Sequence, residues 1–118
     1  MKGETGDLLR LRHILKCTEE IEAILAGVTE SDFYNSLEKK YAVERLLEII
    51  GEAVNRIEPS TLALSKRNIP WSDIVDFRNF VSHEYFRIDY TIVYQIATTE
   101  IYPVKQAVQE IVEHFGNK

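Results

Sequence analysis

Residues 31–57 read SDFYNSLEKKYAVERLLEIIGEAVNRI, and this stretch decides the fold. Its apolar residues recur at intervals of three and four, which is the spacing of an amphipathic helix. They are Leu37, Tyr41, Leu46, Ile49, Ile50, Ala53, Val54 and Ile57. The pattern predicts one long helix that begins at Ser31 or Asp32, ends before Pro59 and forms the spine of the domain. Gly51 lies inside it at a cost of roughly 1 kcal/mol relative to alanine, which a close approach by a neighbouring helix would justify.

The segments on either side of this spine also have helical spacing. The first predicted helix begins near Asp7, a good N-cap residue, and ends at Gly27, a residue that favours helix termination. The connection that follows the spine includes one short helical turn at residues 62–65. A third helix is predicted from an N-cap at Ser72 to about residues 85–87.

The last predicted helix begins at Asp89 and continues to residues 115–116, with Pro103 in its middle. An interior proline removes a backbone hydrogen bond and clashes with the preceding turn, so a kink or two helices are expected. No Asn-Gly or Asp-Gly hairpin signal occurs in the chain. The sequence therefore predicts an all-α fold, an up-and-down four-helix bundle with a kinked C-terminal helix. We expect residues 1–118 to form a single domain.

The composition is that of an ordinary globular protein, with 45% hydrophobic and 28% charged residues. Cys17 is the single cysteine, which excludes an internal disulfide and a cysteine-rich zinc site, and a buried thiol is expected. No apolar run approaches the roughly 18 residues of a membrane span. The first residues lack the uninterrupted apolar region of a secretory signal, so the cytoplasm is the expected compartment.

The net charge of −5 argues against a broad basic surface for nucleic acid. The charges are unevenly distributed, however, and only residues 66–87 are net positive. This stretch holds Lys66, Arg67, Arg78 and Arg87 against Asp73, Asp76 and Glu84. A locally positive site within an acidic protein is therefore expected there.

Arg78, Asn79, His83 and Tyr85 lie within this positive stretch and could carry chemistry. RNA supplies its own nucleophile, the 2′-hydroxyl, so a protein must move protons and stabilise charge on the phosphorane. Histidine titrates near neutral pH and can transfer either proton. Arginine offers a permanent charge and donors that match phosphate oxygens. Arg78 and His83 are therefore a sufficient minimal catalytic pair, and neither a metal nor another cofactor is required.

The helical positions of this pair suggest a second copy of the chain. Arg78 and His83 are five positions apart, which places them about 140° apart around a helix. Arg78 aligns with Tyr85, whereas His83 aligns with Asn79. Two copies that cross at a twofold axis could bring both groups to one phosphate, so we hypothesise a homodimer. A helix that unwinds near His83 is the alternative.

Each of these residues also has an ordinary structural interpretation. An isolated arginine and histidine on a helix are usually surface residues in salt bridges, and a tyrosine such as Tyr85 is often half-buried packing. The Glu48 and Glu52 pair on the second helix would then be a solvated acidic face. Whether this glutamate pair contributes to the site stays open.

A wider pattern surrounds the motif. The segment Ile49–Ala53, of sequence IIGEA, is followed by Ile69–Trp71, of sequence IPW, then by Arg78–Asn79 and His83–Tyr85. With the C-terminal helix and its proline, this ordered set resembles the HepT-like family of the HEPN superfamily over about residues 7–115. The resemblance implies a HEPN-like helical bundle that forms a homodimer.

The resemblance also implies a function. Members are metal-independent endoribonucleases, toxins of type VII toxin–antitoxin modules, with a composite site at the dimer interface. Arg78 and His83 match the catalytic residues, and Asn79 and Tyr85 match the supporting ones. The antitoxin is an MntA-like minimal nucleotidyltransferase that transfers AMP to the motif's tyrosine, here Tyr85. The substrate would be RNA, and larger assemblies with the antitoxin stay open.

Two other functions remain alternatives. The chain could be a non-catalytic helical subunit that binds a nucleotide or substrate for a minimal nucleotidyltransferase. It could also be a structural helical dimer, which would leave the arginine, histidine and tyrosine cluster without a role. Loss of RNA cleavage on substitution of His83 would distinguish the ribonuclease from both.

Overall fold

The computed structural model describes the backbone of residues 3–84 and 88–116, and the side chains of these residues other than 3–4 and 78–84. Within this part of the chain every regular element is helical, which confirms the predicted all-α class. The elements are α1 (Gly3–Leu25), α2 (Glu30–Tyr34), α3 (Leu37–Asn55), α4 (Pro59–Leu62), α5 (Trp71–Glu84), α6 (Tyr90–Gln95), the π-helical segment η2 (Ile96–Glu100) and α7 (Ile101–Gly116). None of the helices in the described ranges is both long and apolar enough to span a membrane.

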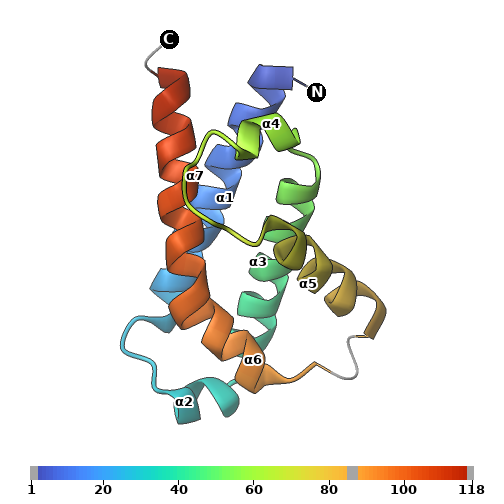
Figure 1. Cartoon of the computed structure of the whole chain (residues 1–118). Helices are drawn as coiled ribbons and strands as arrows, with labels where there is room; N and C mark the ends of the chain where they lie inside the picture. Colours follow the sequence, from blue (N-terminus) through green and yellow to red (C-terminus); the bar gives the residue numbers. More distant parts are fainter. Residues whose placement is uncertain (1–2, 85–87, 117–118) are drawn as a thin grey trace.

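Helices α1, α3 and α7 form the body of the molecule, and α5 lies at its edge (Figure 1). α1 packs against both α3 and α7, whereas α5 packs mainly against α3. The direction of the chain alternates from α1 to α3, α5 and α7, and the two termini lie at the same end (Figure 1). The core between these helices consists of fully buried side chains, which include Leu11, Ile14, Ile21, Val43, Ile50, Val108 and Ile111.

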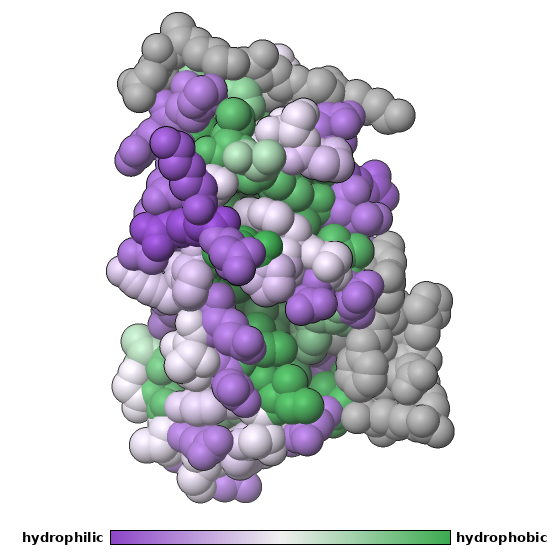
Figure 2. Space-filling view, in the orientation of Figure 1, coloured by the Kyte–Doolittle hydropathy of each residue, from purple (hydrophilic) through white to green (hydrophobic). Residues whose placement is uncertain are grey.

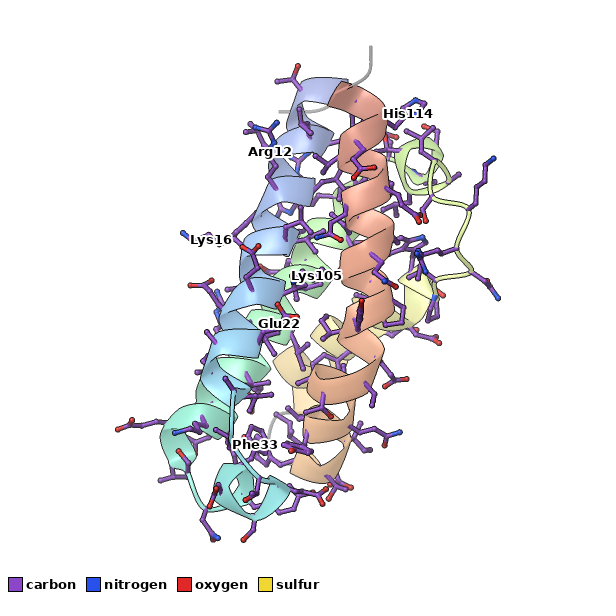
Figure 3. The ribbon with its side chains drawn as sticks, turned by 90° about the vertical axis from the view of Figure 1, so that its left-hand side faces the viewer. Arg12, Lys16, Glu22, Phe33, Lys105 and His114 are labelled. Carbon is purple, nitrogen blue, oxygen red and sulfur yellow. The ribbon has the colours of Figure 1, made fainter. Side chains whose placement is uncertain are left out.

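An ion pair on the surface links α1 to α7. The ammonium group of Lys105 on α7 donates to the carboxylate of Glu22 on α1 at 2.7 Å (Figure 3). Arg12 and Lys16 project from α1 away from this contact (Figure 3). The pair lies outside the core, so it adds little to stability beyond the apolar packing of the two helices.

The predicted long second helix is wrong at its N-terminal end, because the chain breaks it at Asn35 and Ser36. The hydroxyl of Ser36 accepts a hydrogen bond from the backbone N–H of Lys39 at 3.2 Å and starts α3 there. The short helix α2 has its own N-cap, Thr29. The break turns α2 so that Phe33 is fully buried beneath the bundle. Serine at an N-cap competes with helix continuation because its side chain satisfies a backbone donor that lacks an intrahelical partner.

Asp7 is not the N-cap of the first helix, because α1 begins at Gly3 and places Asp7 one turn inside. Its carboxylate is 1% exposed and accepts hydrogen bonds from the hydroxyl of Thr61 at 2.6 Å and from the backbone N–H of Glu58 at 3.3 Å. Asp7 therefore ties α1 to the turn after α3. The predicted end of this helix is confirmed, since Gly27 has a φ of 72°.

The third helix also begins earlier than predicted. α5 starts at Trp71, and the carbonyl of Pro70 accepts from the backbone N–H groups of Asp73 and Ile74. Ser72 is thus inside the first turn rather than at the N-cap. The short turn predicted at residues 62–65 is displaced to α4, where Pro59 occupies the first helical turn.

The last helix is interrupted, as Pro103 predicts, but the interruption lies upstream of the proline. Asp89 caps α6, and its carboxylate accepts from the backbone N–H of Thr91 at 2.9 Å. The π-helical segment η2 separates α6 from α7. Pro103 cannot donate to the carbonyl of Thr99, four residues earlier, and a wider turn relieves the clash of its ring. The hydroxyl of Thr98 donates to the carbonyl of Tyr94 within this region at 2.7 Å.

Candidate active site

Helix α5 carries three of the four predicted site residues. The positions of Arg78, Asn79 and His83 lie in its second half, and their side chains are among those that the structure does not describe. Tyr85 follows the helix and lies outside the described residues. The roles of these residues therefore stay predictions, and the geometry of the site is built from the described half of α5.

The helical periodicity of α5 places some residues of its first half on the same side of the helix as the motif. At about 100° per residue, Ser72, Asp76, Asn79 and His83 occupy one stripe roughly 60° wide. Trp71, Val75 and Arg78 occupy a second stripe of similar width. These positions together define one face of α5, about 160° wide, which we call the motif face. Its first half consists of Trp71, Ser72, Val75 and Asp76.

A pocket of about 510 Å³ lies against the first half of the motif face. We call it the polar pocket, because Asn55, Asn68, Ser72 and Asp76 line it together with Arg67. Its apolar lining includes Val54, Ile57, Leu62, Trp71 and Val75. The pocket lies between the end of α3, the start of α5 and the segment that joins them. We call this segment, residues 56–70, the connection; it includes α4. It has the mixture of apolar surface and a few polar groups that is typical of small-ligand sites.

Polar contacts hold the connection that forms the outer wall of this pocket. The hydroxyl of Ser65 donates to one carboxylate oxygen of Glu110 on α7 at 3.0 Å. The guanidinium Nε of Arg67 donates to the other oxygen at 2.9 Å. At the start of the connection, Thr61 donates to the buried carboxylate of Asp7. The wall is thus fixed to α1 and to α7, which keeps the pocket open in the absence of a ligand.

A second pocket, of about 380 Å³, lies on the opposite side of α5. We call it the apolar pocket, because its lining is dominated by Leu47, Ile50, Ile69, Ile74, Phe77, Ile96, Ile101 and Val104. It separates α5 from η2 and α7. Figure 2 shows hydrophobic surface along the middle of this face of the molecule, between more hydrophilic side chains. This side of α5 is mainly apolar, with Asp73 as its polar residue at the pocket and with Asn68 and Glu100 contributed by other segments.

The acidic residues of α3 are engaged in local contacts. Glu48 forms a salt bridge with Arg45, with a distance of 2.6 Å between Nη1 and Oε1. Its side chain is only 19% exposed, so it is less solvated than the interpretation of a solvated acidic face expects. Glu52 is partly buried on the same helix. Glu44 accepts a hydrogen bond from the hydroxyl of Tyr90 on α6. Any part that Glu48 and Glu52 take in the site stays untested.

The other candidate groups are placed as expected or carry no chemistry. Cys17 is buried, and burial raises the pKa of its thiol, which makes it a poor nucleophile. His13 and His114 are both exposed, and Figure 3 places His114 near the C-terminal end of α7. The described side chains contain no group of three or more histidine, cysteine, aspartate or glutamate residues that could hold a metal ion. His83 is not among them, so metal independence stays a prediction.

Asn55, Asn68 and Asp76 line the polar pocket but were not predicted to take part in the site. The spacing of Asp76 relative to Asn79 and His83 was a signal that could have identified it. No sequence signal predicted Asn55 and Asn68, because they reach the pocket from α3 and from the connection, which only the tertiary structure brings beside α5.

Comparisons with known proteins give a consistent result. The family model described as "Ribonuclease HepT-like" matches residues 14–111. A Methanocaldococcus jannaschii protein named "Putative RNase MJ1216" is 32% identical over 108 residues, which cover 92% of this chain and 88% of that protein. A Caldanaerobacter subterraneus protein named "Putative RNase TTE0752" is 33% identical, with coverage of 87% and 91%. "Probable ribonuclease HepT" of Thermococcus cleftensis is 30% identical, with coverage of 80% and 86%. No solved structure matches the chain at a significant level.

Proposed function

Because the chain belongs to the HepT-like ribonuclease family, we propose that it is an endoribonuclease that cleaves RNA without a metal ion, through Arg78 and His83. The observation that carries the proposal is the family match over residues 14–111, a range that includes the whole motif from Arg78 to Tyr85. The positive local charge of residues 66–87 supports it, because the rest of the chain is acidic. Asn79 and Tyr85 would support the catalytic pair.

The chemistry assigns one task to each member of the pair. His83 would accept the proton of the 2′-hydroxyl or protonate the leaving 5′-oxygen, since imidazole holds or releases a proton near neutral pH. Arg78 would bind the non-bridging phosphate oxygens and stabilise their charge in the transition state. The bond from phosphorus to the leaving oxygen breaks as the 2′-oxygen forms its bond to phosphorus.

The proposed active form is a homodimer of HEPN-like up-and-down bundles. Two positions about 140° apart on one helix do not face a common phosphate easily. α5 lies at the edge of the bundle and packs mainly against α3, so a second copy can approach its motif face (Figure 1). In such a dimer, the arginine of one chain and the histidine of the other would line the same cleft.

Control of this activity would fall on Tyr85. We propose that the protein is the toxin of a toxin–antitoxin pair, with an MntA-like minimal nucleotidyltransferase as antitoxin that transfers AMP to the tyrosine hydroxyl. The added phosphate would bring negative charge into the cleft and repel RNA. Intact-mass measurement after co-expression with such an enzyme should show added AMP that is absent from Tyr85→Phe.

RNA cleavage by the purified protein tests the catalytic assignment. The protein should cleave RNA in the presence of EDTA, and Arg78→Ala or His83→Ala should lower the rate at least 100-fold, the size expected for loss of a general acid–base group. Gln95→Ala, an exposed change on α6, is the control. EDTA-sensitive cleavage, or full activity of His83→Ala, would contradict the mechanism.

Mixing the two inactive variants tests whether the site is composite. If Arg78 and His83 act across the interface, half of the dimers formed from equal amounts carry one intact site, and roughly a quarter of the wild-type activity returns. If both residues act within one chain, the mixture stays inactive. The second result would overturn the dimeric site and leave the catalytic residues in place.

A further inference from the structure

The polar pocket lies in line with the motif along α5. Its helical wall, formed by Trp71, Ser72, Val75 and Asp76, is the first half of the same face that carries the positions of Arg78 and His83. Asp76 and His83 are seven residues apart, which corresponds to about 10 Å along the helix axis. Neighbouring nucleotides of one RNA strand can span that distance. A strand whose phosphate lies at the motif would therefore pass the polar pocket.

The lining of the polar pocket fits an unpaired base. Trp71 lines it with an aromatic ring, and single-stranded RNA is commonly held by bases that stack on such rings. Asn55 and Asn68 supply amide groups that can both donate and accept hydrogen bonds. These groups reach the pocket from α3 and from the connection, opposite the wall that α5 provides. A flat polar heterocycle between them would be contacted on its face and on its edge.

The carboxylate of Asp76 selects among the bases. An ionised carboxylate only accepts hydrogen bonds, and it has two oxygens to offer. Guanine presents two neighbouring N–H donors on its Watson–Crick edge, at N1 and at the N2 amino group, and this pair matches both oxygens. Adenine, cytosine and uracil do not present such an adjacent pair. A phosphate group, in contrast, would be repelled by Asp76.

We propose that the polar pocket binds an unpaired guanine base of the RNA substrate, close to the phosphate that is cleaved. The inference rests on the proposed ribonuclease function and deepens it by naming a base. In this arrangement Asp76 and Asn55 determine which RNA positions are cleaved, and neither takes part in the bond-breaking step. The contacts of Ser65 and Arg67 with Glu110 keep the wall of the pocket in place before RNA arrives.

Trp71 gives this pocket its own reporter, because the chain has a single tryptophan. The fluorescence of the full-length protein is measured during titration with GMP, CMP and UMP. It is also measured with short 2′-O-methyl oligonucleotides, which cannot be cleaved, that contain either one guanine or an abasic site. GMP and the guanine oligonucleotide should quench Trp71 saturably. The abasic oligonucleotide should bind about tenfold more weakly, a difference of about 1.4 kcal/mol.

Variants of the exposed lining residues separate the pocket from general binding. Asp76→Asn and Asn55→Ala should each weaken the binding of GMP and of the guanine oligonucleotide about tenfold. Gln95→Ala removes an equally exposed amide outside both pockets and should leave binding unchanged. Thermal unfolding of each variant verifies that it is folded. Equal affinity of the guanine and abasic oligonucleotides, or unchanged affinity of the two pocket variants, would overturn the proposal.

The two proposals fail in different ways. If RNA is cleaved but neither GMP nor the guanine oligonucleotide changes the fluorescence of Trp71, the pocket assignment is wrong and the ribonuclease assignment stands. If GMP binds with the expected dependence on Asp76 but no RNA is cleaved, the pocket assignment stands and the ribonuclease assignment is wrong. If RNA is not cleaved and GMP does not change the fluorescence of Trp71, both the ribonuclease proposal and the pocket proposal are wrong.

Discussion

The two sides of α5 differ in what surrounds them. On one side Asn55, Asn68 and Asp76 border the polar pocket, whose outer wall is held by hydrogen bonds to α1 and α7. On the other side, apolar side chains such as Ile50 and Phe77 border the apolar pocket. One helix therefore contributes to the core through one face and presents polar groups to a pocket through the other. We therefore expect substitutions on the apolar side to change mainly stability and substitutions on the polar side to change mainly activity.

Ile50→Ala tests the apolar side and should have the largest effect on stability. Ile50 is 1% exposed on α3 and lines the apolar pocket. Truncation removes buried apolar surface and enlarges a cavity, so the free energy of unfolding should fall by about 3 kcal/mol. Urea unfolding measures this, and Leu37→Ala, at a position that is 61% exposed, should change it by less than about 0.5 kcal/mol.

The same variant also tests the independence of the two sides. Under conditions where Ile50→Ala is folded, its affinity for GMP at the polar pocket should equal that of the wild type. A large loss of GMP binding by the folded variant would show that the two sides of α5 are coupled, which would contradict their independence.

Asp7→Asn tests the polar side through its attachment to α1. Oδ2 of the buried carboxylate accepts from both the hydroxyl of Thr61 and the backbone N–H of Glu58. An amide oxygen can occupy the same position, but it lacks the negative charge that strengthens both hydrogen bonds. Hydrogen bonds to charged groups are each worth about 1.5–3 kcal/mol, so we expect a loss of about 2 kcal/mol in the free energy of unfolding. Chemical denaturation measures the loss.

Asp32→Asn is the matched control for Asp7→Asn. Asp32 is exposed and its carboxylate accepts from the backbone N–H of Thr29 in the capping box of α2, so the loss should be about 1 kcal/mol or less. A similar cost at both positions would mean that Asp7 does not hold the connection that forms the wall of the polar pocket.

Tyr90 lies on α6, lines neither pocket and should have the smallest effect at neutral pH. Its partner Glu44 lies eleven positions before Asn55, on the same side of α3. Partial burial, together with the hydrogen bond and the negative charge of Glu44, raises the pKa of the Tyr90 phenol above its usual range. The folded protein thus keeps this proton to a higher pH than the unfolded chain, in which the pKa is about 10.

The sign of the pH dependence follows from these two states. The contribution of Tyr90 is fully present below about pH 10 and is lost as the pH rises toward the folded-state pKa. Tyr90→Phe should therefore lower stability by about 1 kcal/mol at pH 7 and should flatten the decline above about pH 10. Urea unfolding across this range measures both, and an equally steep decline in the variant would show that Tyr90 is not the group responsible.

Local patterns predicted the positions of the long helices and a few of their ends. Apolar spacing located the long helices, Gly27 marked the end of α1, and Asp89 capped α6. The break before α3 was missed because a serine inside an apolar repeat fits either a continued helix or a new N-cap. The burial of Phe33 by the rest of the chain, which local sequence does not reveal, also favours the break.

The parts of the site that sequence could not predict depend on distant residues. Asp7 has the chemistry of an N-cap, and its real partner, Thr61, is 54 residues away. Asn55 and Asn68 line a common pocket only because α3 and the connection meet α5 there. The motif from Arg78 to Tyr85 could be identified from its residues and their order, because these lie within one short segment.

The π-helical segment η2 makes the C-terminal helix longer by one residue than an unbroken α-helix of the same span would be. Deletion of a single residue from Ile96–Glu100 would restore the regular helix. It would also rotate everything before the deletion by about 100° around the axis of α7. Val93 would leave the core, and Tyr90 would lose Glu44. The number of residues in this segment, more than their identity, therefore determines how α6 is rotated relative to α3.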